Sequence, residues 1–192
     1  DILFNLANAQ RQAGRFDAAI ASYRGAIALR PGHIAAYNNL ALLLKTSGEA
    51  EAAAAVLLEA IAHAPSAGEL RFNLGNAFYA AGHLEEAEGA YRKAIEIMAD
   101  RADVHANLGV VLRELGMTDD AERSFRRAIS LDPDLVPAYV GLADLVDNGT
   151  MDALAHRRAV LELKPDLAAV RSSLLMCIHY APDVTRRELF EA

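Results

Sequence analysis

Six asparagines recur in this chain at a fixed spacing, and their side chains are the strongest candidates for a binding site. Four of them are 34 residues apart, and each of the other two follows one of those four by three residues: Asn5, Asn39, Asn73 and Asn107, then Asn8 and Asn76. A carboxamide has two N–H donors and an oxygen with two acceptor lone pairs, which suits it to binding polar groups. Asparagine is also a poor residue for a helix interior, so its repeated use in helical sequence needs an explanation.

The other reactive residue types show no catalytic or metal-binding pattern. Cys177 is the single cysteine, and we expect it to be a buried structural thiol and not a nucleophile paired with His179. The six histidines have no metal-ligand spacing, and the carboxylates of Glu85, Glu86 and Glu88 are typical of a solvated helix face. The sequence therefore predicts no enzyme activity, no metal and no cofactor in this chain.

The composition is that of a globular, helical protein. Of its 192 residues, 53% are hydrophobic and 23% charged, and no alternating run of β-branched residues predicts a strand. A net charge of −7 argues against nucleic acid and anionic membrane as partners, because both require a basic face. The single cysteine favours a reducing compartment, and without an apolar span or a targeting signal we expect a cytoplasmic location.

A repeat of 34 residues organises the chain. Four consecutive segments end at Pro31, Pro65, Ala99 and Pro133, and we number each repeat so that this residue is position 32. In this numbering, position 7 is Leu, position 15 Gly, position 20 Ala, position 24 Tyr, Leu or Phe, and position 27 Ala. A fixed period of this length predicts a fold built from stacked units, none of which can bury its apolar face alone.

This pattern resembles the tetratricopeptide repeat (TPR) over almost the whole chain. The resemblance implies an all-α, right-handed superhelical solenoid in which each unit is a pair of antiparallel helices. We expect the solenoid over 1–167, with units at about 1–33, 34–67, 68–101, 102–135 and 136–167, followed by a partial sixth unit and linker helix over 168–192. The fifth unit is irregular, because Pro165 comes only 32 residues after Pro133.

The recurring asparagines fall opposite the predicted core. At about 100° per residue, positions 6 and 9 lie roughly across the helix from the apolar positions 4, 7, 8 and 11. In the TPR family the first helices line a concave surface, which implies that the six asparagines form an exposed ladder able to hold an extended peptide. A second explanation stays open: the asparagines are consensus residues inherited from one ancestral repeat. For Phe4 and Phe72, beside the ladder, we expect packing between helices.

A narrower resemblance concerns the end of the chain. The ladder, together with "SSLLMCIHYAPDVTRRELFEA" at 172–192, is similar to the repeat region and linker of the O-linked N-acetylglucosamine transferases, particularly their bacterial relatives. The resemblance implies that the chain is the substrate-recruiting arm of such a parent. The chain begins at Asp1, inside a repeat unit, so we expect it to be part of a longer protein.

The alternative function is a structural scaffold or self-association module. A repeat normally expects a neighbour on either side, so the ends of the solenoid should leave apolar surface exposed. Leu3, Leu6 and Ala7 would be uncovered at one end, and Leu175 and Met176 at the other. We therefore expect weak homo-oligomerisation through the ends, besides the binding of a protein or peptide partner.

Overall fold

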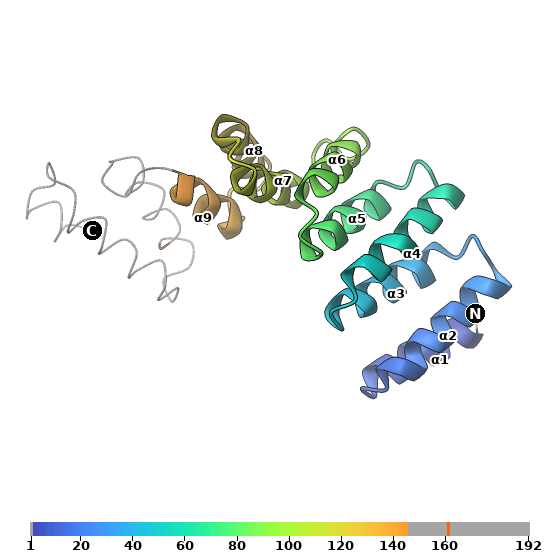
Figure 1. The fold of residues 1–192 in the computed structure, drawn as a ribbon. Coiled ribbons are helices and arrows are strands. Elements are labelled where there is room, and N and C mark those ends of the chain that lie inside the picture. The colour runs from blue at the N-terminus through green and yellow to red at the C-terminus, as the bar shows by residue number, and fades with distance from the viewer. Residues whose placement is uncertain (1, 146–160, 162–192) are drawn as a thin grey trace, which may run out of the picture. The chain divides into compact units, whose positions relative to one another are not determined.

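The computed structural model describes residues 2–145 and residue 161, and this part of the chain is helical without any strand. The predicted all-α fold is confirmed (Figure 1). The helices are α1 (Ile2–Gln12), α2 (Phe16–Leu29), α3 (Ile34–Thr46), α4 (Ala50–His63), α5 (Gly68–Ala80), α6 (Leu84–Ile95), α7 (Ala102–Glu114), α8 (Thr118–Leu131) and α9 (Val136–Leu145).

The chain divides into two compact units, residues 1–99 and 100–192, which are described separately. In the first unit, α1 pairs with α2, α3 with α4 and α5 with α6, and each pair packs on the next. In the second unit, α7 pairs with α8 and α9 packs against both. Most of the irregular fifth unit expected over 136–167, the partial sixth unit and linker helix expected over 168–192, and Cys177 lie outside the described residues.

The glycine at position 15 forms the turn inside each helix pair. Gly14, Gly48, Gly82 and Gly116 have φ between 72° and 87°, a left-handed conformation in which a side chain is strained. The residue after each glycine donates its N–H to a carbonyl five residues back, as in Arg15 to Gln10 at 2.8 Å and His83 to Phe78 at 2.9 Å. This is the Schellman closure of a helix, and it reverses the chain so that the second helix can pack on the first.

Proline ends the second helix of three repeats. The residues before Pro31, Pro65 and Pro133 have φ between −144° and −139° with positive ψ, the extended conformation that a following proline favours. The third repeat has Ala99 instead, and its second helix α6 ends two positions earlier in the repeat, at Ile95.

The core lies between the helices of each pair. Alanine at position 20 is fully buried in all four repeats, and the large residue at position 24 is at most 1% exposed: Tyr23, Leu57, Tyr91 and Phe125. A methyl group built on Gly75 would lie 2.5 Å from the ring of Tyr91, and one built on Gly109 would lie 2.7 Å from the ring of Phe125. In the third and fourth repeats the aromatic ring therefore occupies the space that a side chain at position 8 would fill, whereas the first two repeats have alanine there.

We predict that Gly75→Ala destabilises the protein by about 1–3 kcal/mol, because the buried ring of Tyr91 cannot move aside in a packed core. The matched control is Gly89→Ala in α6, where an added methyl group meets no atom within 4 Å. There the better helix propensity of alanine should stabilise the protein by about 0.5–1 kcal/mol. Urea unfolding of both variants checks this, and a stable Gly75→Ala protein would show that the ring does not limit the approach of the helices.

A polar contact links the two helices of the second repeat. Tyr37 of α3 is fully buried, and its hydroxyl donates to Oε1 of Glu59 on α4 at 2.8 Å. Burial, followed by the hydrogen bond and the charge of Glu59, raises the pKa of Tyr37 from 10.0 to about 12.

This shift predicts how stability depends on alkaline pH. The folded-state pKa is raised, so the contribution of Tyr37 to stability is fully present below pH 10.0 and is lost as the pH rises through about 12. Tyr37→Phe should abolish this loss, so that the difference in unfolding free energy between wild type and variant changes across that interval. Urea unfolding at several pH values measures the difference, and a difference that is constant across the interval would contradict the prediction.

Candidate peptide-binding face

The six asparagines differ in exposure more than the helical pattern predicted. Asn5 is exposed, but Asn8, Asn39, Asn73, Asn76 and Asn107 are half-buried. The expected exposure is therefore found for Asn5, whereas the other five are less exposed than expected. The reason within the first unit is that several of these amides form hydrogen bonds to a neighbouring repeat or to a buried tyrosine.

Asn8 joins three helices through its carbonyl oxygen. The hydroxyl of Tyr23 on α2 donates to Oδ1 of Asn8 at 2.6 Å, and Nδ2 of Asn39 on α3 donates to the same oxygen at 3.0 Å. Two donors use both lone pairs of that oxygen. The amide on the face of α1 thus satisfies a hydroxyl from the core and also links the first repeat to the second.

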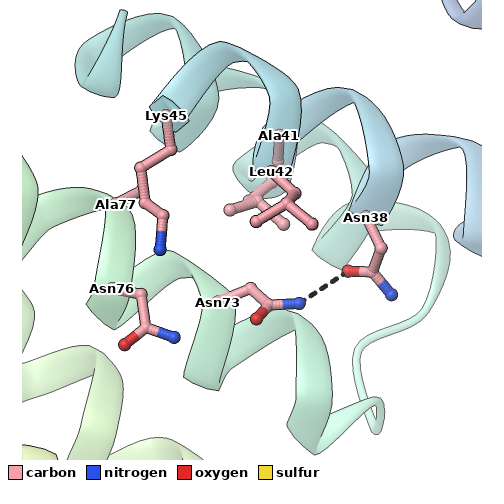
Figure 2. Close-up of a pocket in the computed structure, with 8 residues that line it drawn as sticks. Asn38, Ala41, Leu42, Lys45, Asn73, Asn76 and Ala77 are labelled. Atoms are coloured by element: carbon pink, nitrogen blue, oxygen red, sulfur yellow. Dashed lines mark hydrogen bonds between the residues drawn. The ribbon is translucent and has the colours of Figure 1, made fainter. Parts of the chain in front are cut away.

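Both kinds of contact recur at the third repeat. Nδ2 of Asn73 on α5 donates to Oδ1 of Asn38 on α3 at 3.0 Å (Figure 2). The hydroxyl of Tyr91 on α6 donates to Oδ1 of Asn76 at 2.8 Å. Asn38 was not among the predicted site residues, since it stands at position 5. The signal that could have revealed it is Leu42, which occupies position 9 of that repeat and offers Asn73 no acceptor.

Positions 9 and 24 carry matching residue types in the four repeats. Tyrosine at position 24 accompanies asparagine at position 9 in the first and third repeats, whereas the second repeat has Leu57 with Leu42 and the fourth has Phe125 with Val110. A buried hydroxyl needs an acceptor, and a repeat without the hydroxyl does not. This pairing accounts for Asn8 and Asn76, and for the absence of asparagine from the other two repeats at position 9.

The ladder is continuous only in part. Within the first unit, the amide pairs Asn8–Asn39 and Asn38–Asn73 connect α1 to α3 and α3 to α5. Asn5 lies on α1, three residues before Asn8. Asn107 lies on α7 of the second unit and is half-buried.

A small pocket lies between α3 and α5, on the face that carries the amides (Figure 2). It encloses about 30 Å³, the space of one water molecule. Its lining combines amides, one cation and apolar side chains: Asn38, Ala41, Leu42, Lys45, Leu57, Asn73, Asn76 and Ala77. Leu42 is 50% exposed, so the pocket adjoins apolar surface that a partner can cover. This combination suits a peptide carbonyl next to an apolar side chain.

The phenylalanines beside this face belong to the helix packing, as expected. The ring of Phe4 lies 6.0 Å from that of Tyr23 and 4.7 Å from that of His33, between centroids. The ring of Phe72 lies 6.1 Å from that of Tyr91.

Residues 2–145 and 161 contain neither a metal-binding cluster nor a membrane-spanning helix. No group of three His, Cys, Asp or Glu side chains in this part of the chain is arranged to hold a metal ion. None of the helices described there is both long and apolar enough to cross a bilayer.

We predict that Asn8→Ala destabilises the protein by about 1–3 kcal/mol, because it leaves the Tyr23 hydroxyl buried without its acceptor. Tyr23→Phe combined with Asn8→Ala should recover most of that loss. The matched control is Asn5→Ala on the same helix, which should change stability by less than about 0.5 kcal/mol because Asn5 is exposed. Thermal and urea unfolding of these variants, of Tyr23→Phe alone and of the wild type measures the coupling, and equal losses for Asn8→Ala and Asn5→Ala would contradict the assigned bond.

Comparisons with known proteins agree with this geometry. Sequence models described as "TPR repeat" match residues 7–48 and 75–116, and those described as "Tetratricopeptide repeat" match residues 34–66 and 102–135. No curated protein sequence matches the chain significantly.

Among solved structures, the chain is similar to MamA, with a TM-score of 0.76, 22% identity and coverage of 85% of this chain and 96% of that one. It is also similar to YrrB, with a TM-score of 0.71, 19% identity and coverage of 92% and 89%. A thermophilic TPR protein of Thermus thermophilus gives a TM-score of 0.69, 24% identity and coverage of 92% and 97%.

At these identities, the structural likeness concerns the fold. The sequence matches together span residues 7–66 and 75–135, more than half of the chain, and coincide with the helix pairs described above. The chain therefore belongs to the tetratricopeptide repeat family.

Proposed function

We propose that this chain is a protein-interaction module that binds an extended polypeptide segment across the first helices of its repeats. The binding surface is the amide face of the first unit, defined as Asn38, Leu42 and Lys45 together with five of the predicted asparagines: Asn5, Asn8, Asn39, Asn73 and Asn76. The observation that carries the proposal is the pocket between α3 and α5, where amide groups, a lysine and a half-exposed leucine meet.

The amides retain capacity for a ligand after their contacts within the protein. The bonds from Asn39 and Asn73 use one N–H of each amide, and a carboxamide has a second N–H and a carbonyl oxygen besides. An extended peptide presents donors and acceptors in alternation along its backbone. The amide pairs fix the orientation of the side chains before binding, which lowers the entropy lost on association.

The comparisons support this proposal at the level of the fold. YrrB is described as "a TPR protein with an unusual peptide-binding site", and the present chain shares its helical architecture. That description and the amide face together are the reasons for proposing that this chain binds a peptide. A cytoplasmic location stays a prediction from the sequence.

The parent protein is a further part of the proposal. Recruitment of substrates for an O-linked N-acetylglucosamine transferase-like enzyme rests on residues 172–192, which lie outside the described residues, and none of the comparisons supports it. It stays a prediction from the sequence, and the protein sequence beyond Ala192 in the parent would test it directly.

A second candidate function is self-association, and one observation favours it. Ile2 is 85% exposed and Leu6 is 44% exposed on α1, so the first helix presents apolar side chains to solvent. Ala7, which was expected to share this exposure, is fully buried.

A matched pair of substitutions tests the amide face. Linear peptides are selected from a random phage-displayed library on the wild-type protein, and their affinities are measured by fluorescence polarisation. Leu42→Ala should weaken binding several-fold, and Asn73→Ala should weaken it about fivefold, the equivalent of about 1 kcal/mol for one hydrogen bond.

The control is Leu29→Ala on α2, because Leu29 is 79% exposed and does not line the pocket between α3 and α5. This substitution should leave the affinities unchanged. Affinities that are indifferent to both Leu42→Ala and Asn73→Ala would refute binding at the amide face.

A further inference from the structure

A second surface of the first unit differs from the amide face in shape and charge. A crevice of about 330 Å³ opens between α4, α5 and α6, and its size falls at the lower end of the range typical of ligand pockets. Its walls come from three helices of two repeats: Leu58, Ile61, Arg71, Leu74, Phe78, Glu86, Gly89, Ala90 and Lys93. We call it the α4–α6 crevice.

The crevice lies on another side of α5 from the amides. Asn73, Asn76 and Ala77 line the small pocket next to α3, whereas Leu74 and Phe78 line the crevice next to α4. At about 100° per residue the centres of these two sets are separated by more than a quarter turn of the helix. The two surfaces can therefore be changed independently.

Substitutions particular to the second and third repeats create the apolar part of this surface. Position 25 is arginine in three repeats, at Arg24, Arg92 and Arg126, but Leu58 in the second. Leu58 is 52% exposed at the edge of the crevice, where the other repeats have a charge. In the third repeat, Gly89 contributes no side chain, and a methyl group added there would meet no atom within 4 Å.

The charge of the crevice comes from positions 4 and 26, which are neighbours across a helix pair. Leu3 lies against Gly25 in the first repeat, and Tyr37 donates to Glu59 in the second. In the third repeat the same positions hold Arg71 and Lys93. The first two repeats thus have a neutral or a hydrogen-bonded pair at these positions, whereas the third repeat has two cations, and both line the crevice.

Within the protein, these cations are only partly compensated. Arg71 is half-buried and donates from Nη1 to the carbonyl oxygen of Pro65, which uses one of the five N–H donors of its guanidinium. The lining contains one carboxylate, Glu86, whose Oε1 lies 3.7 Å from Nδ1 of His83. The crevice therefore has a net positive charge, although the whole chain has a charge of −7.

We propose that the α4–α6 crevice is a second docking site, which takes an acidic amphipathic segment of a protein partner. A bulky apolar side chain of that segment fills the space above Leu74 and Ala90 and covers Leu58. Its flanking Asp or Glu residues pair with Arg71 and Lys93. Buried apolar anchors rimmed by charge pairs are typical of the residues that dominate protein interfaces.

The probe is a synthetic amphipathic peptide with leucine and phenylalanine on one face and glutamate on both flanks. Its comparison peptide has every glutamate replaced by lysine. Binding to the full chain is measured by fluorescence polarisation at two salt concentrations. The acidic peptide should bind at least tenfold more tightly than the basic one, and added salt should reduce this ratio.

Two substitutions test the assigned contacts. Lys93→Glu should weaken binding of the acidic peptide at least tenfold and narrow the preference over the basic peptide. Leu58→Ser, which removes the exposed apolar side chain without adding a charge, should also weaken it. Lys93 is exposed, so its substitution should leave folding intact, and circular dichroism confirms this for each variant.

Lys45→Glu is the control, because it reverses a lysine charge on the amide face and should leave this affinity unchanged. Equal binding of the two peptides, or an affinity indifferent to Lys93→Glu, would overturn the proposal. Concentration-dependent dimerisation of the wild type that Leu58→Ser abolishes would overturn it as well, since the occupant would then be a second copy of the chain. The proposed function would be unaffected, because its test responds to Leu42 and Asn73.

Discussion

The described structure depends on the close approach of the two helices in each repeat. An aromatic ring or a leucine from the second helix occupies the position above a residue of the first helix that has little or no side chain. In the third and fourth repeats that residue is glycine, and any larger residue would overlap with Tyr91 or Phe125. Because protein interiors are close-packed, this contact determines how near the helices can lie. The Schellman turn at position 15 and the small alanines at positions 20 and 27 also allow the two helices to lie close together.

This contact also connects the core to the amide face. When the large residue is tyrosine, its ring is buried but its hydroxyl reaches the surface of the first helix, where it must find an acceptor. Asn8 and Asn76 supply that acceptor. Two kinds of asparagine can therefore be distinguished. Those at position 9 accept the hydrogen bond of a buried tyrosine hydroxyl, whereas Asn39 and Asn73 at position 6 link successive repeats through one N–H each.

Much of the fold could be predicted from the sequence, because a 34-residue period repeats the same local rules. The positive φ of the four turn glycines, the burial of the alanines at position 20 and the prolines after three second helices follow from properties of single residues at fixed repeat positions. The environment of the asparagines was predicted less well. A helical projection places Asn39 and Asn73 opposite the core of their own helix, but it does not include the preceding repeat, whose Asn8 and Asn38 accept hydrogen bonds from them. The contact between Asn38 and Asn73 needed the register of α3 against α5. The α4–α6 crevice likewise arises from residues of three helices, so no single helical pattern indicates it.

The matched residues at positions 9 and 24 constrain the order in which such a chain can evolve. A repeat that changes tyrosine to phenylalanine first leaves a half-buried amide that water can satisfy, so the intermediate is tolerated. A repeat that loses its asparagine first must pass through an intermediate with an unsatisfied hydroxyl in the core. New surface chemistry at position 9 of the first and third repeats is therefore accessible by single mutations only after the buried residue has changed, whereas the second and fourth repeats can diversify there at once.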